Sequence, residues 1–427
     1  MTNPQAAEQY AALDAWIDAH FDEEVHFLQA LVQVPTDTPP GDNAPHAERT
    51  AELLHGFGFE AEKHPVPAQA VKDYGLQSIT NLIVRRQYGS GGSGPTIALN
   101  AHGDVVPPGE GWTHDPYGAE VVHDPQHGAT MYGRGVAVSK SDFATYVFCL
   151  LALRGLAAQG ATLRGAVELH LTYDEEAGGE IGPHWLLERG LSKPDLAISA
   201  GFSYAVTTAH NGCLHLEVVV HGRQGHAAMP ERGADALAAA TQILTALYAS
   251  REALKARLSK TRGITHPTLN VGLIAGGINT NVVPDRVSFR IDRRIIPEES
   301  PQAAEAELRS LIETAAARIP GIRVEVRRIL LSLPLVKLPG AERLTEVLQR
   351  HGAHFFGVAI GEHGVPIYTD ARHYTAAGIP TVLYGAGPRT LAEANGHAAD
   401  ENLRLEDLRR ATKTVASTLA ELLDTTA

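Results

Sequence analysis

The stretch that decides the fold is Thr96-Ile-Ala-Leu-Asn-Ala-His-Gly-Asp-Val-Val-Pro107, a short apolar run followed by a tight His-Gly-Asp turn. Its first part, Thr96–Asn100, has the length and composition of a buried strand. Four similar runs predict further buried strands: Leu82–Arg85, Val167–Thr172, Leu196–Ser199 and Thr381–Tyr384. Helices are predicted between or after the strands, at Asp142–Leu156, Leu344–His351 and Leu405–Leu423. This alternation predicts an α/β domain with a mostly parallel sheet covered on both faces.

Two helices are predicted before the first strand. The opening segment Ala7–Val34 repeats its apolar residues at helical spacing, which predicts one helix, and a second helix is predicted from about Pro45 to Phe57.

Histidine and acidic side chains follow two of the predicted strands. His102 and Asp104 come just after the first strand quoted above, and Glu175 and Glu176 come just after Val167–Thr172. Ligands of open parallel sheets bind beyond the carboxyl ends of the strands. A histidine with paired carboxylates can bind a divalent cation and activate water. A capped strand end and a solvated acidic turn are the alternatives for these two motifs, but the buried strands before them favour a functional site.

The middle of the chain has a different pattern. Its strands alternate apolar and polar residues, and its helices include one that begins at Ser300-Pro301 with serine as the N-cap. The predicted order is strand, helix, strand, strand, helix, strand, as in a ferredoxin-like α+β domain. The elements are Leu214–His221, Ala234–Tyr248, Thr268–Leu273, Arg286–Ile291, the helix from Ser300 and Ile322–Ile329. We therefore expect residues 211–330 to be inserted into a domain formed by 1–210 and 331–427.

Composition limits the class of protein and its partners. A chain of 427 residues is too long for one ordinary core, and 44% apolar with 20% charged residues is typical of a soluble globular protein. The formal net charge of −13 argues against a nucleic-acid or anionic-membrane partner. The two cysteines, Cys149 and Cys213, exclude a disulfide scaffold, and the polar N-terminus lacks a secretion signal, so a cytoplasmic location is expected.

Further motifs occur in a recognisable order along almost the whole chain. They are Asn100–Pro107, Tyr132–Lys140, Thr172–Gly179, Gly222–Pro230, Gly276–Pro284, Asp292–Pro297, Asp370–Arg372 and Asn395–Glu401. Together they resemble the metallopeptidase family of carboxypeptidase G, acetylornithine deacetylase, succinyl-diaminopimelate desuccinylase and aminoacylase. The resemblance implies a zinc-peptidase-like catalytic domain with an inserted lid or dimerisation domain, small-molecule substrates, and a homodimer or higher homo-oligomer.

The resemblance also implies roles for individual residues. His102, Glu176 and His397 match metal ligands, Asp104 matches the acid that orients a ligating histidine, and Glu175 matches the general base. Other matched residues would contact the substrate: His226, Asn281 and Arg294 of the inserted domain, with His226 reaching across a dimer. A bidentate pair with a substrate carboxylate is predicted for Arg294 or Arg372.

Two acids of the family pattern are missing. Val138 stands where the pattern has a metal-bridging aspartate, and Ser199–Tyr204 lacks the Asp or Glu that the pattern places there. Asp142 lies one helical turn beyond Val138, but we expect it to cap or flank the helix that begins there.

The missing charge bears on the number of metal ions. Paired cations lie ~3.5–4 Å apart in two-metal sites. At about 4 Å and an effective dielectric of about 20, two dications repel by roughly 16 kcal/mol, which bridging and flanking acids normally offset. We therefore predict one weakly held divalent transition metal on His102, Glu176 and His397. Mixed nitrogen and oxygen ligation suits zinc, manganese and cobalt alike.

Three functions remain open on this basis. The first is hydrolysis of a C–N bond in a small carboxylate-bearing substrate, such as an N-acyl amino acid or dipeptide, through water activated by the metal and Glu175. The second is release of ammonia from an activated aromatic amine such as nitroanthranilate. The third is an inactive binding relative, which Val138 favours and which the intact Asp104, Glu175, Glu176 and His397 oppose.

Overall fold

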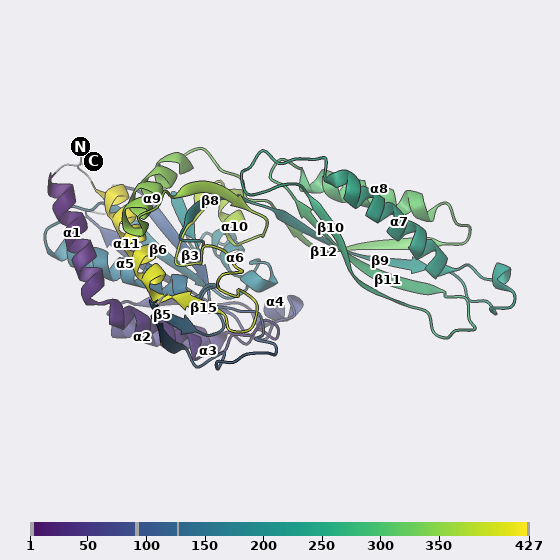
Figure 1. Cartoon of the computed structure of the whole chain (residues 1–427), viewed down its shortest axis with the longest axis horizontal. Coiled ribbons are helices and arrows are strands. Elements are labelled where there is room, and N and C mark those ends of the chain that lie inside the picture. Colours follow the sequence, from purple (N-terminus) through teal and green to yellow (C-terminus); the bar gives the residue numbers. More distant parts are fainter. Residues whose placement is uncertain (1–3, 90–93, 126–127, 425–427) are drawn as a thin grey trace. The chain divides into compact units, whose positions relative to one another are not determined.

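A computed structural model describes residues 4–89, 94–125 and 128–424. The chain divides into two compact units (Figure 1). Unit 1 holds the described residues up to Thr208, Lys337–Glu362, and those from Thr369 on, and unit 2 holds Ala209–Val336 and His363–Tyr368. These bounds differ from the expected 211–330, because the segment around Gly364 joins unit 2: the amide of Gly364 donates to the carbonyl of Arg262 at 2.7 Å.

Unit 1 is built on an eight-stranded sheet with the order β1-β2-β6-β3-β7-β14-β8-β13. Its central strands β6, β3, β7 and β14 run parallel, whereas β1 and β2 on one side and β8 on the other pair antiparallel with their neighbours. The strands are β1 (Ala61–Pro65), β2 (Thr80–Tyr88), β3 (Thr96–His102), β6 (Gly165–Thr172), β7 (Leu196–Ser199), β8 (Ala205–His210), β13 (Gly361–Val365) and β14 (Thr381–Leu383). All five strands predicted from apolar runs are present, and the predicted α/β fold class is confirmed.

Helices cover both faces of this sheet. On one face α5 (Lys140–Ala158) packs on β3 and β6, and α11 (Leu405–Leu423) and α9 (Ala341–Phe356) pack beside it. On the other face α10 (Ala371–Ala376) packs on β7 and β14 and against α6 (Pro183–Glu188). The remaining helices of the unit are α1 (Pro4–Ala19), α2 (Phe21–Val32), α3 (Ala44–Gly56) and α4 (Ala68–Asp73).

Helix α5 is apolar on nearly all sides. By length and composition it could cross a membrane, but 78% of its apolar stretch is buried inside unit 1. It contacts the sheet on one side and α1, α2 and α11 on the others, so its composition is that of a central core helix.

The predicted single helix over 7–34 is wrong, because the chain breaks between α1 and α2. His20 leaves the helical conformation with φ −114°, and its ring stacks on Trp16 with the centroids 3.9 Å apart. The three acids that follow, Asp22, Glu23 and Glu24, occupy the first turn of α2, where negative charge favours a new helix N-terminus.

A three-stranded sheet that the sequence did not predict joins two distant segments. Its order is β15-β5-β4, with β4 (Glu120–Asp124), β5 (Gly128–Tyr132) and β15 (Asn402–Arg404). Antiparallel pairing of β15 with β5 places the residues before 402 beside those after 132, and the Gly133 amide donates to the Glu401 carbonyl at 2.9 Å. The Val138 segment and the His397 segment therefore run side by side.

Unit 2 is an antiparallel four-stranded sheet with two helices on one face (Figure 1). The strand order β10-β11-β9-β12 confirms the predicted ferredoxin-like topology. The elements are β9 (Gly212–His221), α7 (Ala236–Leu254), β10 (Thr268–Gly276), β11 (Arg286–Ile295), α8 (Pro301–Ala316) and β12 (Arg323–Ser332). Ser300 caps α8 as predicted, since its side chain accepts a hydrogen bond from the Ala303 amide.

The two faces of the unit 2 sheet differ in chemistry. Leu214, Leu216, Val218 and Val220 of β9 belong to the buried core beneath α7 and α8. The alternate residues of β9, which begin with Cys213 and His215, therefore lie on the face away from the helices.

Candidate active site

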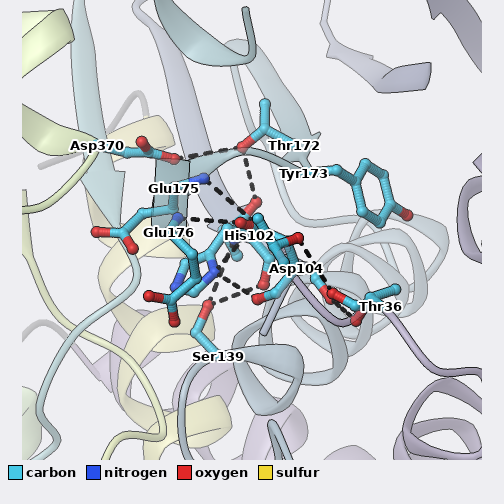
Figure 2. A network of polar contacts seen from close by, with 12 residues as sticks. Thr36, His102, Asp104, Ser139, Thr172, Tyr173, Glu175, Glu176 and Asp370 are labelled. Carbon is cyan, nitrogen blue, oxygen red and sulfur yellow. Dashed lines mark hydrogen bonds and ion pairs between the residues drawn. The ribbon is translucent and has the colours of Figure 1, made fainter. Parts of the chain in front are cut away.

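The site is built at the carboxyl ends of two neighbouring parallel strands. In the register of β3 and β6, His102 is paired with Thr172. The turns that follow the two strands therefore start at the same level, and they bring the side chains of His102, Glu175 and Glu176 together (Figure 2). Each of these three offers a potential ligand atom within 4.8 Å of the other two.

Asp104 fixes both turns. Its carboxylate is fully buried, lies 3.4 Å from His102 Nδ1, and accepts the backbone amides of Glu175 at 3.3 Å and Glu176 at 3.0 Å. Nδ1 of His102 also donates to the Asp104 carbonyl at 3.0 Å. With Nδ1 used as a donor, Nε2 of His102 keeps its lone pair for a cation, which is the arrangement of a ligating histidine with an orienting carboxylate.

The backbone of His102 is held as firmly as its ring. Ser139 Oγ donates to the His102 carbonyl at 3.1 Å, and the His102 amide donates back to Ser139 Oγ at 3.3 Å (Figure 2). The neighbouring Gly103 carbonyl accepts the Thr36 hydroxyl at 2.6 Å. These bonds leave the imidazole little freedom to turn away from the acids.

The acids of the site interact strongly. Burial raises the pKa of Glu175 to about 8, and the charges of Glu176 and Asp104 add to this effect while His102 and His397 oppose it. Burial disfavours protonated His102, yet the hydrogen bond to Asp104 and the charges of Glu175 and Glu176 prevail and hold its pKa well above the ordinary value. Such an excess of negative charge around an imidazole is what a bound divalent cation offsets.

His397 reaches the site from a loop with unusual backbone angles. Its φ is +64°, and Asn395 and Asp400 in the same loop have φ of +51° and +56°. Left-handed angles at non-glycine residues persist only where surrounding contacts impose them. Here Asp400 Oδ1 accepts the Thr113 amide at 2.8 Å, and the carboxylate of Glu401 pairs with Arg134 at 2.6 Å.

The residues present fit a metal ion. Nε2 of His397 lies 3.1 Å from Oε1 of Glu176, which also helps to raise the pKa of His397. That oxygen is buried and has no hydrogen-bond partner among the described residues. A buried carboxylate oxygen that faces the His397 imidazole without a well-aligned hydrogen bond is expected of a ligand atom, because it would otherwise be costly to desolvate. The nitrogen and oxygen donors suit a divalent transition metal.

The acids Glu401 and Asp142, which lie near Val138 in space or in sequence, are hydrogen-bonded to other groups of the protein. Glu401 Oε1 accepts the backbone amides of Ala137 at 3.0 Å and Val138 at 3.1 Å, and its other oxygen pairs with Arg134. Asp142 lies in the first turn of α5, where Oδ1 accepts the Ala386 amide at 2.6 Å. Both carboxylates thus hold backbone segments in place.

The segment after β7 contributes hydroxyls and backbone. Ser199 Oγ donates to Asn100 at 2.9 Å, and Ser203 Oγ donates to the Gly387 carbonyl at 2.8 Å. A Cβ at Gly201 would lie 2.7 Å from Cβ of Leu383, so the segment packs backbone against backbone with the chain after β14. No carboxylate in 199–204 therefore stands in for the missing acid.

The predicted substrate residues of unit 2 do not lie together. His226 and Asn281 are adjacent in two loops, since His226 bridges to Val282 and the Ala227 amide donates to the Asn281 carbonyl at 3.1 Å. These loops lie beyond the Arg286 end of β11, whereas Arg294 lies at its other end. Eight residues of strand at ~3.4 Å each separate the two ends by about 27 Å.

Two residues near the site have contacts that the sequence did not predict. Arg372 is only 3% exposed, and its guanidinium donates to the Gly178 carbonyl, so it braces the turn that carries Glu175. Asp370 accepts a hydrogen bond from Thr172 at 3.4 Å, and burial followed by the charges of Glu175 and Asp174 keeps its pKa well above the ordinary value (Figure 2). The motif Asp370–Arg372 was the signal available, but its position gave no indication of which strand end it would meet.

Comparisons with known proteins agree with this geometry. The family model for peptidase family M20/M25/M40 matches residues 98–421. The chain is 26% identical over 395 residues to an acetylornithine deacetylase of Myxococcus xanthus, covering 92% of this chain and 96% of the relative. It is 30% identical over 302 residues to a succinyl-diaminopimelate desuccinylase of Methylorubrum populi, covering 67% of this chain and 71% of the relative.

Solved structures share the fold at lower identity. The di-peptidase Dug1p of Saccharomyces cerevisiae has a TM-score of 0.74 at 15% identity, with 97% of this chain and 98% of that chain covered. The YXEP protein of Bacillus subtilis, described as a dinuclear metal-binding peptidase, has a TM-score of 0.66 at 18% identity, with 95% and 99% covered. The chain belongs to peptidase family M20/M25/M40, a family of metal-dependent hydrolases of amide and peptide bonds.

Proposed function

We propose that the protein hydrolyses a C–N bond in a small carboxylate-bearing substrate of the N-acyl amino acid or dipeptide type. The observation that carries the proposal is the convergence of Glu175 with His102 and Glu176 within 4.8 Å, with His397 at 3.1 Å from Glu176. His102, Glu176 and His397 then serve as the metal ligands. The carboxylate of Glu175 lies beside them and remains available as a base.

The proposed roles follow from the contacts. A divalent cation on His102, Glu176 and His397 supplies Lewis acidity for water and carbonyl oxygen. Glu175 accepts a proton from water as the new C–O bond forms, and it returns that proton to the nitrogen as the C–N bond breaks. Asp104 orients His102 and fixes the turn that carries Glu175 and Glu176.

The substrate carboxylate is assigned to Arg294. Its side chain is 29% exposed and its Nε is held by Asp292 at 2.9 Å, so one edge of the guanidinium is oriented while the group still reaches solvent. Arg372 is a weaker candidate for this role because it is buried and engaged with Gly178.

His226 and Asn281 are proposed to act from a second subunit of a homodimer. Both are exposed, and they lie about 27 Å along β11 from Arg294. A substrate small enough for a deacylase cannot touch both ends of that strand. Supply by a second copy would allow all three to meet one substrate and stabilise the negative charge that develops on it.

We further propose that one cation works here, and that it is weakly held. With Val138 in place of an acid and only hydroxyls in 199–204, the roughly 16 kcal/mol repulsion between two dications at about 4 Å has no bridging carboxylate to offset it. Three protein ligands leave positions open for water and substrate, as in catalytic zinc sites.

A second candidate function follows from the same charge deficit. A single cation polarises an amide carbonyl less than a pair does, whereas an aromatic ring with an electron-withdrawing substituent provides its own sink for negative charge. Water would then add to the amine-bearing carbon of an aminobenzoate such as nitroanthranilate, and the C–N bond would break with release of ammonia.

One assay separates these functions and tests both. Metal-loaded protein is supplied with N-acyl amino acids, dipeptides and nitroanthranilate, and released amine and ammonia are measured with Glu175→Ala as the paired variant. Amine release from acyl substrates that Glu175→Ala abolishes supports the first function, and ammonia release from the aromatic amine alone supports the second. Turnover that survives Glu175→Ala contradicts the role of this residue, and an absence of any turnover with metal bound points to a binding relative.

A further inference from the structure

Three side chains of unit 2 meet on the face of the sheet away from α7 and α8. Cys213 and His215 are alternate residues of β9, so they share that face. The register of β9 with β11 pairs His215 with Asp292 and Cys213 with Arg294. Because directly paired residues of antiparallel strands point to the same side, Asp292 joins the two residues of β9.

The potential ligand atoms of these residues converge. Nε2 of His215 lies 3.1 Å from Cys213 Sγ and 3.1 Å from Asp292 Oδ2, and Sγ lies 3.9 Å from Asp292 Oδ1. A tetrahedral zinc site with Zn–S of about 2.3 Å and Zn–N and Zn–O of about 2.0–2.2 Å places its ligand atoms roughly 3.4–3.6 Å apart. The three measured distances bracket that range.

We propose that Cys213, His215 and Asp292 form a second cation site, separate from the site in unit 1, for a thiophilic divalent ion such as Zn²⁺ or Co²⁺. A thiolate is a soft ligand that selects such ions over Mg²⁺, Ca²⁺ and Mn²⁺. The unit 1 site has only nitrogen and oxygen donors, so the two sites differ in the ions they prefer.

The unit 2 cluster is buried on one side and open to solvent on the other. Cys213 is fully buried, whereas the side chains of His215 and Asp292 are 34% and 31% exposed. Three protein ligands with a solvent-facing fourth position describe an exchangeable site, in contrast to the closed four-ligand sites that serve structure alone.

Arg294 supports the carboxylate without taking the place of the cation. Its Nε donates to Asp292 Oδ1 at 2.9 Å and its second terminal nitrogen to Oδ2 at 3.1 Å. Each carboxylate oxygen has a second lone pair, and ligating carboxylates are normally hydrogen-bonded in this way. Occupancy of the site would therefore also fix Arg294, the residue proposed to bind the substrate carboxylate.

A second group of three in unit 1 is less suited to a cation. Glu180, His184 and His373 also offer ligand atoms within reach of one another. However, a guanidinium nitrogen of Arg372 lies 2.8 Å from Nε2 of His373, and another lies 3.6 Å from Glu180. A guanidinium donor therefore already occupies Nε2 of His373, a nitrogen with a single lone pair, whereas the carboxylate of Asp292 has lone pairs to spare beside Arg294.

Cobalt titration tests the proposal in the full-length protein. The metal-stripped chain is titrated with Co²⁺, and the near-ultraviolet sulfur-to-cobalt charge-transfer band is recorded. We expect the band in the wild type and its retention in Cys149→Ser. In Cys213→Ser we expect the band to disappear and the bound Co²⁺ to fall by one equivalent per chain. Cys149 is the matched control because it is the other cysteine of the chain, buried in unit 1 with its thiol donating to the Thr412 carbonyl.

A second variant separates ligation from folding. Asp292→Asn keeps the shape of the side chain and both cysteines, and we expect Co²⁺ to bind more weakly while far-ultraviolet circular dichroism stays that of the wild type. Absence of the band in the wild type, or its persistence in Cys213→Ser, overturns the proposal. Because the unit 1 site has no sulfur ligand, either result leaves the proposed hydrolytic function untouched.

Discussion

Oε1 of the buried Glu401 carboxylate accepts the backbone amide of Val138 at 3.1 Å. The other oxygen of the same carboxylate pairs with Arg134 at 2.6 Å. The acid that contacts position 138 is thus engaged with main chain and guanidinium, while the side chain at 138 brings no charge. This relationship underlies the proposal that the unit 1 site holds a single cation.

Restoring an acid at position 138 should create a second binding position. Val138→Asp adds the carboxylate that offsets cation repulsion, so we expect bound metal in the unit 1 site to rise from one to two per chain. Val138→Asn, which has the same shape without the charge, should stay at one. The measurement is the metal bound in equilibrium with excess Zn²⁺, made in the Cys213→Ser background so that the unit 2 cluster does not contribute. A Val138→Asp protein that still binds one ion would show that position 138 does not limit the site.

Substitutions of Glu175 and Glu176 should reduce activity for different reasons. Glu175→Gln removes the proton acceptor but no ligand, so kcat should fall by ~10²–10⁴ with metal content unchanged. Glu176→Gln weakens a ligand, and its defect should be partly rescued by excess metal. The two are compared by steady-state kinetics over a metal titration. Equal rescue of both variants would refute the separate roles.

Mixed dimers test whether His226 and Arg294 serve one site from different subunits. His226→Ala and Arg294→Ala should each be almost inactive. Each hybrid dimer has one doubly altered and one intact site, so the purified hybrids should recover about half of the wild-type activity. Co-expression with two different purification tags provides the hybrids. Hybrids as inactive as their parents would place both residues in the same subunit's site.

Stability should depend on pH through Glu24. This carboxyl is buried in α2, with one oxygen bonded to Thr412, and burial raises its pKa to about 8 from the ordinary 4.5. At a pH below the ordinary pKa of 4.5, Glu24 holds its proton in both the folded and the unfolded chain, so the free energy of unfolding does not depend on its titration. As the pH rises towards about 8 only the unfolded chain ionises, so the free energy of unfolding falls, by an amount on the order of 5 kcal/mol in total.

Glu24→Gln should remove this dependence. The amide cannot ionise, so the variant should gain stability over the wild type as the pH rises from about 5 to about 9. Urea unfolding at both ends of this range is the measurement, with the exposed neighbour variant Glu23→Gln as the control. A constant difference between wild type and Glu24→Gln across the range would show that Glu24 is ionised throughout.

Local patterns were sufficient for most of the fold. The apolar runs 96–100 and 167–172 and the alternation in 214–221 each encode burial directly, and the corresponding β3, β6 and β9 form as predicted. The break at His20 was missed because apolar spacing continues across it. Strand β15 was missed because its pairing with β5 joins residues some 270 positions apart, which no local pattern records. Strands β4 and β5 pair with each other locally and were also missed.

The site was predictable only where motifs sit at strand ends. His102, Asp104, Glu175 and Glu176 follow β3 and β6 directly, and the register of these strands brings them together. The contacts of Glu401 with Val138 and of Asp370 with Thr172 depend on tertiary packing between distant segments. Cys213 and His215 alternate along a strand, which is a visible pattern, but Asp292 joins them only through the register of β9 with β11.

The most direct test of the central claim is the metal content of the unit 1 site. Cys213→Ser is used so that the unit 2 cluster does not contribute, and the protein is loaded with excess Zn²⁺ or Mn²⁺, dialysed, and analysed for bound metal. One ion per chain that is lost on continued dialysis is the predicted result. Two ions per chain that are retained through dialysis would contradict the account.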